Sequence, residues 1–176
     1  MAYIHNLLVV IFVAFALSPN VTADLISKLC AEANHPPKCL EALKSDRRSK
    51  TASLEGLAFI AIDAADKYAK TVRGLVQSLL KSAKTAQLKS RYSSCLENYE
   101  DSIDSLDRCT EFLKAKDYGS LDSYASAALD FPGTCDDDFA DPPAEPGQLK
   151  AASAKLQDFC DVVLLVSSKL SGRKVQ

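Results

Sequence analysis

The stretch Tyr92-Ser-Ser-Cys-Leu-Glu-Asn-Tyr-Glu-Asp-Ser-Ile-Asp-Ser-Leu106 has two different faces when it is read at helical spacing. Apolar residues recur every three or four positions, which is the pattern of a long amphipathic helix. They are Leu88, Tyr92, Cys95, Tyr99, Ile103, Leu106 and Leu113. Glu97, Asp101 and Asp104 recur at the same steps on another side. Cys95 lies in the apolar stripe and therefore predicts a partner elsewhere in the chain.

Two short helical segments precede this stretch. They run from Leu25 to Cys30 and from Lys38 to Leu43. The intervening His35-Pro36-Pro37 must interrupt the helix, because proline lacks an N–H and restricts the residue before it. A Cys30–Cys39 disulfide is the simplest staple for a hairpin too short to be stable alone. Ser45 to Lys50 is read as a polar link.

Two long helices follow the link. The first has apolar spacing from Leu54 to Leu79, and Thr51 or Ser53 can cap its start. The second contains the opening stretch and is expected to run from about Ala86 to Lys116. Asp117-Tyr-Gly119 is expected to close it.

A third helix is expected to open at Ser120 or Asp122. It contains Pro132, which is costly in a regular helix interior, by about 3 kcal/mol. The sequence therefore predicts a kink or a restart before Thr134. Tyr124 is placed on the inward face of this helix, and Tyr92, Tyr99 and Tyr124 are all expected in the core with tethered hydroxyls.

A loop over Asp141-Pro-Pro-Ala-Glu-Pro-Gly147 separates the third helix from a last one, whose apolar residues run from Leu149 to Leu170. No sustained period-2 alternation competes with these helices. Four amphipathic helices with short connections predict an all-α, up-down-up-down four-helix bundle. Residues 49–176 would form the bundle and residues 24–48 the N-terminal disulfide-stapled helical hairpin.

Six cysteines in a chain with a secretory leader are read as disulfide formers before metal ligands. In the predicted topology Cys95 and Cys135 lie at similar heights on neighbouring antiparallel helices, so we expect a bridge between them. Cys109 and Cys160 both fall on apolar faces. They could form a third bridge, but helix counting leaves them at different heights and favours two free thiols.

The leader is the segment 1–23. Leu7 to Leu17 is an apolar run of signal-peptide length, Ser18-Pro19 breaks it, and Val21-Thr22-Ala23 is a cleavage site of small-residue type. The run is short for a membrane span. The sequence therefore predicts a secreted chain that begins near Asp24 and has no membrane anchor.

Several function classes find no support. The formal net charge of −2 gives no basic footprint for nucleic acid. After the leader the chain has one histidine, His35, expected in an exposed turn, so no nucleophile–base pair predicts an enzyme. Asp136-Asp-Asp138 lacks the further ligands of a hard-cation site. We therefore expect neither a metal nor a cofactor.

Four segments taken together resemble one known family, the plant invertase and pectin methylesterase inhibitors. They are Leu25-Ile-Ser-Lys-Leu-Cys30 with Cys39-Leu40, Leu88-Lys-Ser-Arg-Tyr-Ser-Ser-Cys-Leu-Glu-Asn-Tyr99, Tyr124-Ala-Ser-Ala-Ala-Leu129 with Gly133-Thr-Cys-Asp136, and Asp161-Val-Val-Leu-Leu-Val-Ser-Ser168. The resemblance covers essentially the whole chain after the leader. It implies a helical hairpin, a four-helix bundle and disulfides Cys30–Cys39 and Cys95–Cys135.

The family has two branches, and the acidic segment Glu97–Asp104 with Gly133-Thr-Cys-Asp-Asp137 is similar to the pectin methylesterase branch. The Pro-Lys-Phe element of the invertase branch is missing. The resemblance implies a protein, monomeric when free, that covers the cleft of an apoplastic pectin methylesterase in a reversible one-to-one complex. The implied contact residues are Glu97, Asp101, Asp104, Thr134 and Asp137.

Pro132 and Cys109 depart from the family pattern. Two alternatives stay open at this point. One is an inhibitor of acid invertase, in the cell wall or vacuole. The other is a secreted structural or ligand-carrying bundle without an enzyme target, which a sizeable apolar cavity would favour.

Overall fold

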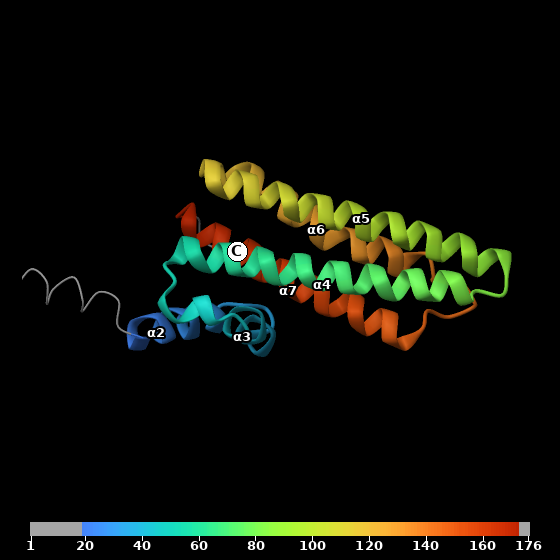
Figure 1. Cartoon of the computed structure of the whole chain (residues 1–176), viewed down its shortest axis with the longest axis horizontal. Coiled ribbons are helices and arrows are strands. Elements are labelled where there is room, and N and C mark those ends of the chain that lie inside the picture. Colours follow the sequence, from blue (N-terminus) through green and yellow to red (C-terminus); the bar gives the residue numbers. More distant parts are fainter. Residues whose placement is uncertain (1–18, 173–176) are drawn as a thin grey trace, which may run out of the picture.

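The computed structural model describes residues 19–172, so most of the expected leader lies outside the described residues. Figure 1 shows a long bundle with a small helical hairpin packed beside one of its ends. Within the described residues every regular element is a helix. The order is α2 (Pro19–Ala31), α3 (Pro36–Lys44), the short 3₁₀ helix η1 (Arg47–Thr51), α4 (Leu54–Ser82), α5 (Ala86–Ala115), α6 (Tyr118–Asp137) and α7 (Gly147–Leu170).

The hairpin consists of α2 and α3, which a Cys30–Cys39 disulfide joins with a Cα–Cα distance of 5.4 Å. The helix is interrupted before the two prolines, as expected, because α2 ends at Ala31. Pro36 and Pro37 themselves form the first turn of α3, where a residue without an N–H costs no helical hydrogen bond. The segment read as a polar link contains most of η1, because the Asp46 carboxylate accepts a hydrogen bond from the Arg48 N–H at 2.8 Å and caps this turn.

The four long helices form the predicted up-down-up-down bundle. Each packs against the next along the chain, and α7 returns to pack against α4, which closes the ring (Figure 1). The core is built from the apolar stripe of each helix, and the largest fully buried side chains include Leu57, Tyr99, Leu121 and Leu156. The hairpin rests on α4 and α7 through α3.

The ends of the long helices follow their local capping residues. Ser53 caps α4, since its hydroxyl accepts from the Gly56 N–H at 3.2 Å. The junction of α5 and α6 differs from the prediction. Lys116, with φ of 58°, takes the left-handed position that ends α5, and Asp117 caps α6 by accepting from the Ser120 N–H. Gly119 therefore lies inside α6 instead of closing α5.

Pro132 does not make α6 restart, because the helix continues from Tyr118 to Asp137. A proline at this position leaves the carbonyl of Ala128, four residues earlier, without its helical donor. The buried hydroxyl of Ser102 on α5 donates to that carbonyl at 2.9 Å. A neighbouring helix thus supplies the missing hydrogen bond, which a pattern within α6 alone could not reveal.

The contacts between α5 and α6 advance by seven residues along both helices. Cys95 is joined to Cys135 with a Cα–Cα distance of 4.6 Å, Ser102 reaches Ala128, and the Cys109 thiol donates to the Leu121 carbonyl at 3.7 Å. This spacing is that of coiled-coil-like packing and fixes the antiparallel register. Cys109 and Cys160 are buried free thiols, as the sequence favoured, and burial raises the pKa of both.

Candidate partner-binding surface

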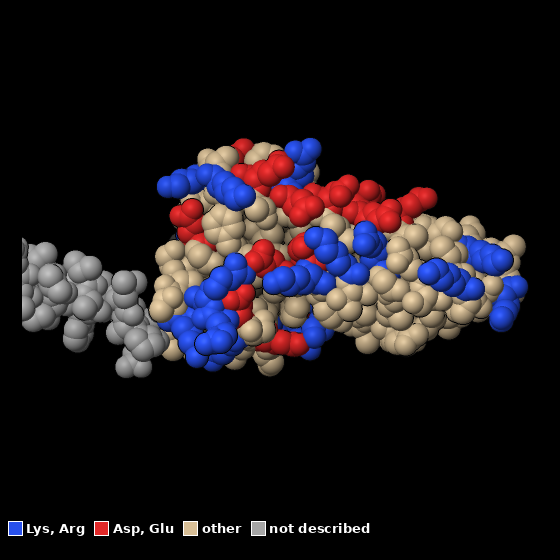
Figure 2. Space-filling view, in the orientation of Figure 1, with Lys and Arg blue, Asp and Glu red and all other residues tan. Residues whose placement is uncertain are grey.

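An acidic stripe runs along the outer side of α5. We define it as Glu97, Glu100, Asp101, Asp104 and Asp107, all of which are exposed. Figure 2 shows the acidic side chains gathered over this helix. The stripe spans about 15 Å at the rise of an α-helix. The buried residues Tyr99, Ile103 and Leu106 set its direction, because they fix which side of α5 faces the core.

The stripe carboxylates form no ion pair with the described part of the chain. Among the residues that the structure describes, none of its five carboxylates lies within ion-pair distance of a Lys, Arg or His side chain, whereas the next carboxylate along, Glu111, pairs with Arg108 at 2.8 Å. The sequence identified Glu97, Asp101 and Asp104. It missed Glu100 and Asp107, which helical spacing from Asp104 could have found.

Thr134 and Asp137 lie on the last turn of α6, and both are exposed. The Cys95–Cys135 disulfide and the register of α5 and α6 place Thr134 level with residue 96, beside the Glu97 end of the stripe. Asp104 lies about 12 Å farther along the bundle at the helical rise. Four of the five predicted residues therefore lie near the disulfide end, and Asp104 extends the surface along α5.

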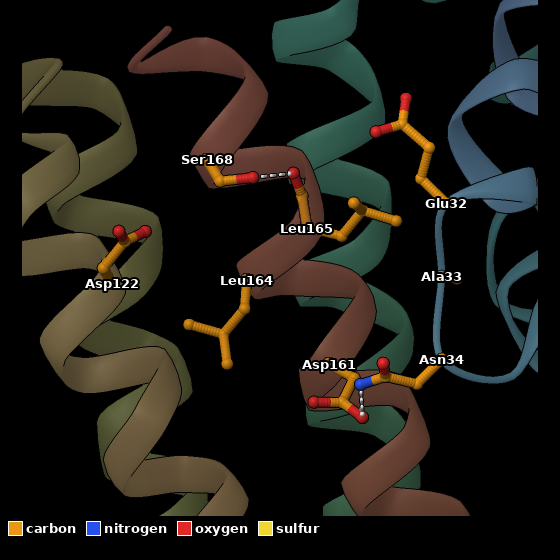
Figure 3. Close-up of a pocket in the computed structure, with 8 residues that line it drawn as sticks. All are labelled: Glu32, Ala33, Asn34, Asp122, Asp161, Leu164, Leu165 and Ser168. Carbon is orange, nitrogen blue, oxygen red and sulfur yellow. Dashed lines mark hydrogen bonds between the residues drawn. The ribbon is translucent and has the colours of Figure 1, made fainter. Parts of the chain in front are cut away.

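Two surface hollows are candidates for a small ligand. One, of about 240 Å³, lies between the α2–α3 turn and helices α6 and α7 (Figure 3), where Asn34 donates to Asp161 at 3.2 Å. The other, of about 470 Å³, is lined by Ala23, Ile26, Lys44, Ser49 and Lys50. Both open at the surface, whereas ligand pockets are commonly enclosed clefts of about 300–1,000 Å³. Neither is the enclosed apolar cavity that a ligand-carrying bundle would need.

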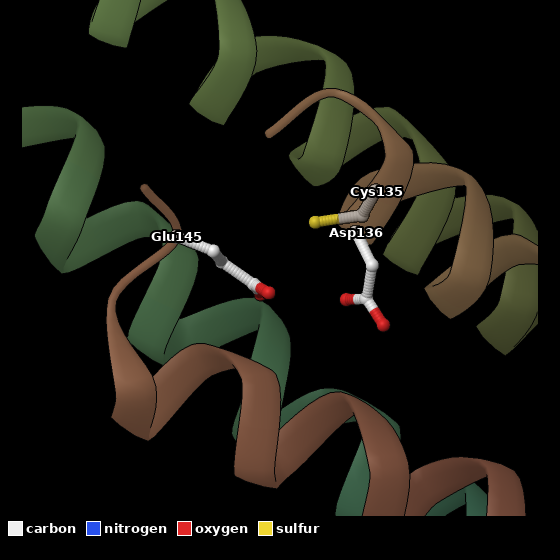
Figure 4. A group of neighbouring side chains, drawn as sticks. All are labelled: Cys135, Asp136 and Glu145. Carbon is white, nitrogen blue, oxygen red and sulfur yellow. The ribbon is translucent and has the colours of Figure 1, made fainter. Parts of the chain in front are cut away.

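One group of side chains has the proximity of a metal site but not its chemistry. Cys135 Sγ and one carboxyl oxygen from each of Asp136 and Glu145 lie within 4.8 Å of one another (Figure 4). Cys135 is committed to its disulfide. That leaves two carboxyls, which is too few for calcium and lacks the nitrogen or sulfur ligands of zinc. Burial and the neighbouring Asp136 raise the pKa of Glu145 to about 7.

Four side chains outside the stripe bear on other expectations from the sequence. His35 is exposed, as expected, and its ring pairs with Asp158. Tyr92 and Tyr99 are buried. Tyr124 was expected on the inward face but is 39% exposed, and its ring packs against that of Phe112 with centroids 5.2 Å apart. The Tyr99 hydroxyl is not tethered, because no hydrogen-bond partner reaches it among the described residues.

Residues 24–166 match the model of a family described as plant invertase/pectin methylesterase inhibitor. The chain belongs to this inhibitor family. It is 45% identical to a pectinesterase inhibitor of Actinidia deliciosa, with 98% of this chain and 95% of that protein covered. It is 30% identical to a cell wall / vacuolar inhibitor of fructosidase from Arabidopsis thaliana, over 85% of this chain and 84% of the relative.

The fold of the family agrees with the structure. A crystal structure of a mutant pectin methylesterase inhibitor from Arabidopsis superposes with a TM-score of 0.72 at 26% identity, covering 81% of this chain and 95% of that one. The family resemblance inferred from the sequence is therefore confirmed, and so is the helical bundle. In residues 19–172 no helix has the length and apolar character needed to cross a membrane.

Proposed function

We propose that this protein inhibits a plant pectin methylesterase by covering the active-site cleft in a reversible one-to-one complex. The observation that carries the proposal is the acidic stripe of α5, unpaired and held on a rigid helix, in a chain 45% identical to a pectinesterase inhibitor. Glu97, Asp101 and Asp104, with Thr134 and Asp137, are the proposed contact residues. The protein acts by binding and has no catalytic role of its own.

The physics of the stripe suits the recognition of a basic surface. Carboxylates on a rigid helix lose little conformational freedom on binding, and their combined field speeds the encounter with Lys or Arg side chains of a partner. Thr134 and Asp137 add a neutral donor and a further charge at the disulfide end. The Cys95–Cys135 bridge keeps both helices in one register, so the surface is formed before the enzyme arrives.

Inhibition of an acid invertase is the second candidate, because one relative at 30% identity is named an inhibitor of fructosidase. The acidic stripe does not distinguish the two targets. The Pro-Lys-Phe element that the resemblance associates with invertase inhibition is missing from this chain. We therefore rank the pectin methylesterase first.

The proposal includes secretion to the cell wall after removal of residues 1–23, with the free protein as a monomer. Cleavage before Asp24 would leave the buried residues Ile26, Leu29 and Cys30 of α2 in place. Asp24 would then begin the helix, where its negative charge is favourable, and it already pairs with Lys28 at 2.7 Å. The hairpin thus keeps its described packing in the mature chain.

A paired titration tests the proposal. The mature, oxidised protein is added to a pectin methylesterase and, separately, to an acid invertase at mildly acidic pH. Loss of methylesterase activity alone is the expected result. Loss of invertase activity alone would assign the protein to the other target, and inhibition of neither by folded protein would overturn both proposals.

The stripe is tested by the triple variant Glu97→Gln, Asp101→Asn and Asp104→Asn. A charge-matched control is Asp24→Asn, Glu55→Gln and Asp141→Asn, which removes three carboxylates outside α5. We expect the stripe variant to bind the enzyme at least about tenfold more weakly, chiefly through slower association, because close complementary charges set the on-rate. Equal weakening by both variants would show that net charge, and not this surface, is recognised.

A further inference from the structure

The connection between α6 and α7, residues 138–146, is fastened to the bundle by Arg91 of α5. The Arg91 guanidinium donates to the carbonyls of Asp141 and Pro143 at 2.9 Å each. It also lies over the ring of Phe139, 5.3 Å from the centroid, and that ring packs against Tyr92. Arginine stays charged at all physiological pH values, so this attachment does not change with pH.

A second attachment lies near the other end of the same connection. Glu145 points toward Asp136 at the end of α6 (Figure 4), and a carboxyl oxygen of each lies within 4.8 Å of the other. Asp136 Oδ1 and Glu145 Oε1 are both buried, and no N–H or O–H of the described residues reaches either oxygen. Two ionised carboxylates in this position would repel each other, and neither of these buried oxygens would have a hydrogen-bond donor.

One proton removes the conflict. A protonated Glu145 becomes a hydrogen-bond donor to Asp136, which satisfies one orphaned oxygen and cancels one of the two charges. The alternative, a pair of ionised carboxylates, leaves two buried acceptors unsatisfied. The geometry therefore favours a singly protonated pair, as in other proteins where two carboxyl groups lie side by side in one site.

Little positive charge lies near the two carboxyls to favour their ionised forms. Lys150 on α7 acts on both carboxyls and is the cation that faces them, while Asp137 on α6 adds negative charge near Asp136. From α5, Tyr92 and Tyr99 face the pair, and burial raises the pKa of both hydroxyls. From α4, Tyr68 faces Tyr99. The Ser153 hydroxyl on α7 acts on Asp136 but donates to the Pro132 carbonyl at 3.2 Å. Burial outweighs Lys150, so the pKa of Glu145 is raised to about 7 and that of Asp136 is also raised.

We propose that Asp136 and Glu145 share one proton, and that this proton-bridged pair clasps the α6–α7 connection to the bundle in acidic surroundings and loosens it as the pH approaches neutrality. Asp136 of this pair lies next to Asp137 and two residues after Thr134, so the pair is a positioning device for that end of the contact surface. This last consequence rests on the proposed function, whereas the clasp itself does not.

The pH dependence has a definite sign. Glu145 holds its proton up to about pH 7 in the folded state, but only to the ordinary value of 4.5 when unfolded. Between these values the folded protein binds more protons, so its stability falls as the pH rises. We expect the melting temperature of the wild-type protein to drop by about 3–6 °C from pH 5 to pH 8 through this pair.

Glu145→Gln isolates the pair, because a glutamine amide donates to Asp136 at every pH. This variant should lose most of the drop in melting temperature between pH 5 and pH 8. Asp141→Asn is the matched control, since Asp141 is an exposed carboxylate on the same connection, and it should keep the wild-type profile. A Glu145→Gln profile that follows the wild type would overturn the proposal.

Carboxyl NMR measures the proton directly, and its first readout uses the wild-type protein, so it does not depend on how variants fold. In the wild-type protein one glutamate carboxyl carbon should titrate with a midpoint near pH 7 and be absent from Glu145→Gln. Asp136→Asn should move that midpoint down by at least about one pH unit, because the neighbouring charge is gone. If no glutamate titrates above about pH 5.5, the carboxyls do not share a proton.

Calcium chloride at pH 8 tests whether a cation, instead of a proton, joins the two carboxyls. The proposal expects no rise in melting temperature beyond that of Asp141→Asn or of a matched magnesium control. A rise specific to calcium and lost in Glu145→Gln would overturn the proton as the bridging group.

The link to inhibition is measured last. If the clasp positions Thr134 and Asp137, wild-type inhibition of pectin methylesterase should weaken from pH 5.5 to pH 7.5 more than that of Glu145→Gln, in the range where the enzyme itself stays active. Identical weakening would remove the positioning role. Failure of the wild type to inhibit any methylesterase would refute the proposed function, yet the melting and NMR results on the free protein would still decide the clasp.

Discussion

The acidic stripe of α5 and the Asp136–Glu145 pair contain the same chemical groups in opposite surroundings. The stripe carboxylates are exposed and unpaired, so water solvates them and their charge is available to a partner. Each member of the pair has one buried oxygen without a donor, a carboxyl oxygen of each lies within 4.8 Å of the other, and the pKa of Glu145 rises to about 7. Solvation, and not residue type, decides whether a carboxyl in this protein presents a negative charge or keeps a proton near neutral pH.

Both regions depend on the same covalent link. Cys95 lies two residues before Glu97, and Cys135 is bonded directly to Asp136 in the chain. The disulfide between them therefore holds the start of the stripe and the proton-sharing pair at one end of the bundle. Substitutions at this disulfide should affect both regions, whereas substitutions within one region should leave the other unchanged.

Removal of the Cys95–Cys135 disulfide by the double change to serine should have the largest effect. The bridge closes a loop with a sequence separation of 40, and the chain-entropy model predicts a loss of about 4 kcal/mol in the free energy of unfolding. The same double change at Cys30 and Cys39, with a separation of 9, should cost about 1 kcal/mol less. Urea denaturation of the two variants measures the difference, and an equal or reversed order would show that local packing outweighs loop length.

The parts of the fold that the sequence predicted rest on local periodicity. The stripe residues and the buried Tyr99 and Leu106 follow directly from spacing along one helix. Asp117 was missed as the cap of α6 because Gly119 two residues later is a stronger apparent stop signal. Helix boundaries depend on which of several adjacent capping residues is used, and spacing does not decide that.

The parts that the sequence could not predict depend on partners from other elements. Pro132 stays in a continuous helix because Ser102 reaches the Ala128 carbonyl. Glu145 lies in a proline-rich loop, and one of its carboxyl oxygens becomes buried near Asp136 only after α6 and α7 have packed. Long-range desolvation of this kind leaves no mark in a single sequence.

Ser102→Ala tests the helix that carries both the stripe and this compensating hydrogen bond. The Ala128 carbonyl would become a buried acceptor without a donor, which costs about 1–2 kcal/mol. Pro132→Ala in the same background should recover part of the loss, because alanine restores a backbone N–H to the helix. Ser90→Ala, at an exposed position of α5, is the control. Additive effects of the two substitutions in a thermodynamic cycle would contradict the coupling.

Glu97→Gln and Glu145→Gln make one chemical change in the two surroundings, and the first should have the smallest effect on stability. Because Glu97 is exposed and unpaired, its neutralisation should alter the free energy of unfolding by less than about 0.5 kcal/mol and leave the pH profile of melting unchanged. It should instead slow association with the methylesterase at low salt, and the difference from wild type should shrink as added salt screens the charges. Glu145→Gln should show the reverse, with an altered melting profile and an association rate near that of wild type at acidic pH, where residue 145 is uncharged in both proteins.

Stopped-flow association and thermal melts on the same two variants measure all four quantities. If Glu97→Gln also flattened the melting profile, the stripe would be coupled to the proton-sharing pair through the Cys95–Cys135 end of α5, and the two surroundings would form one electrostatic unit.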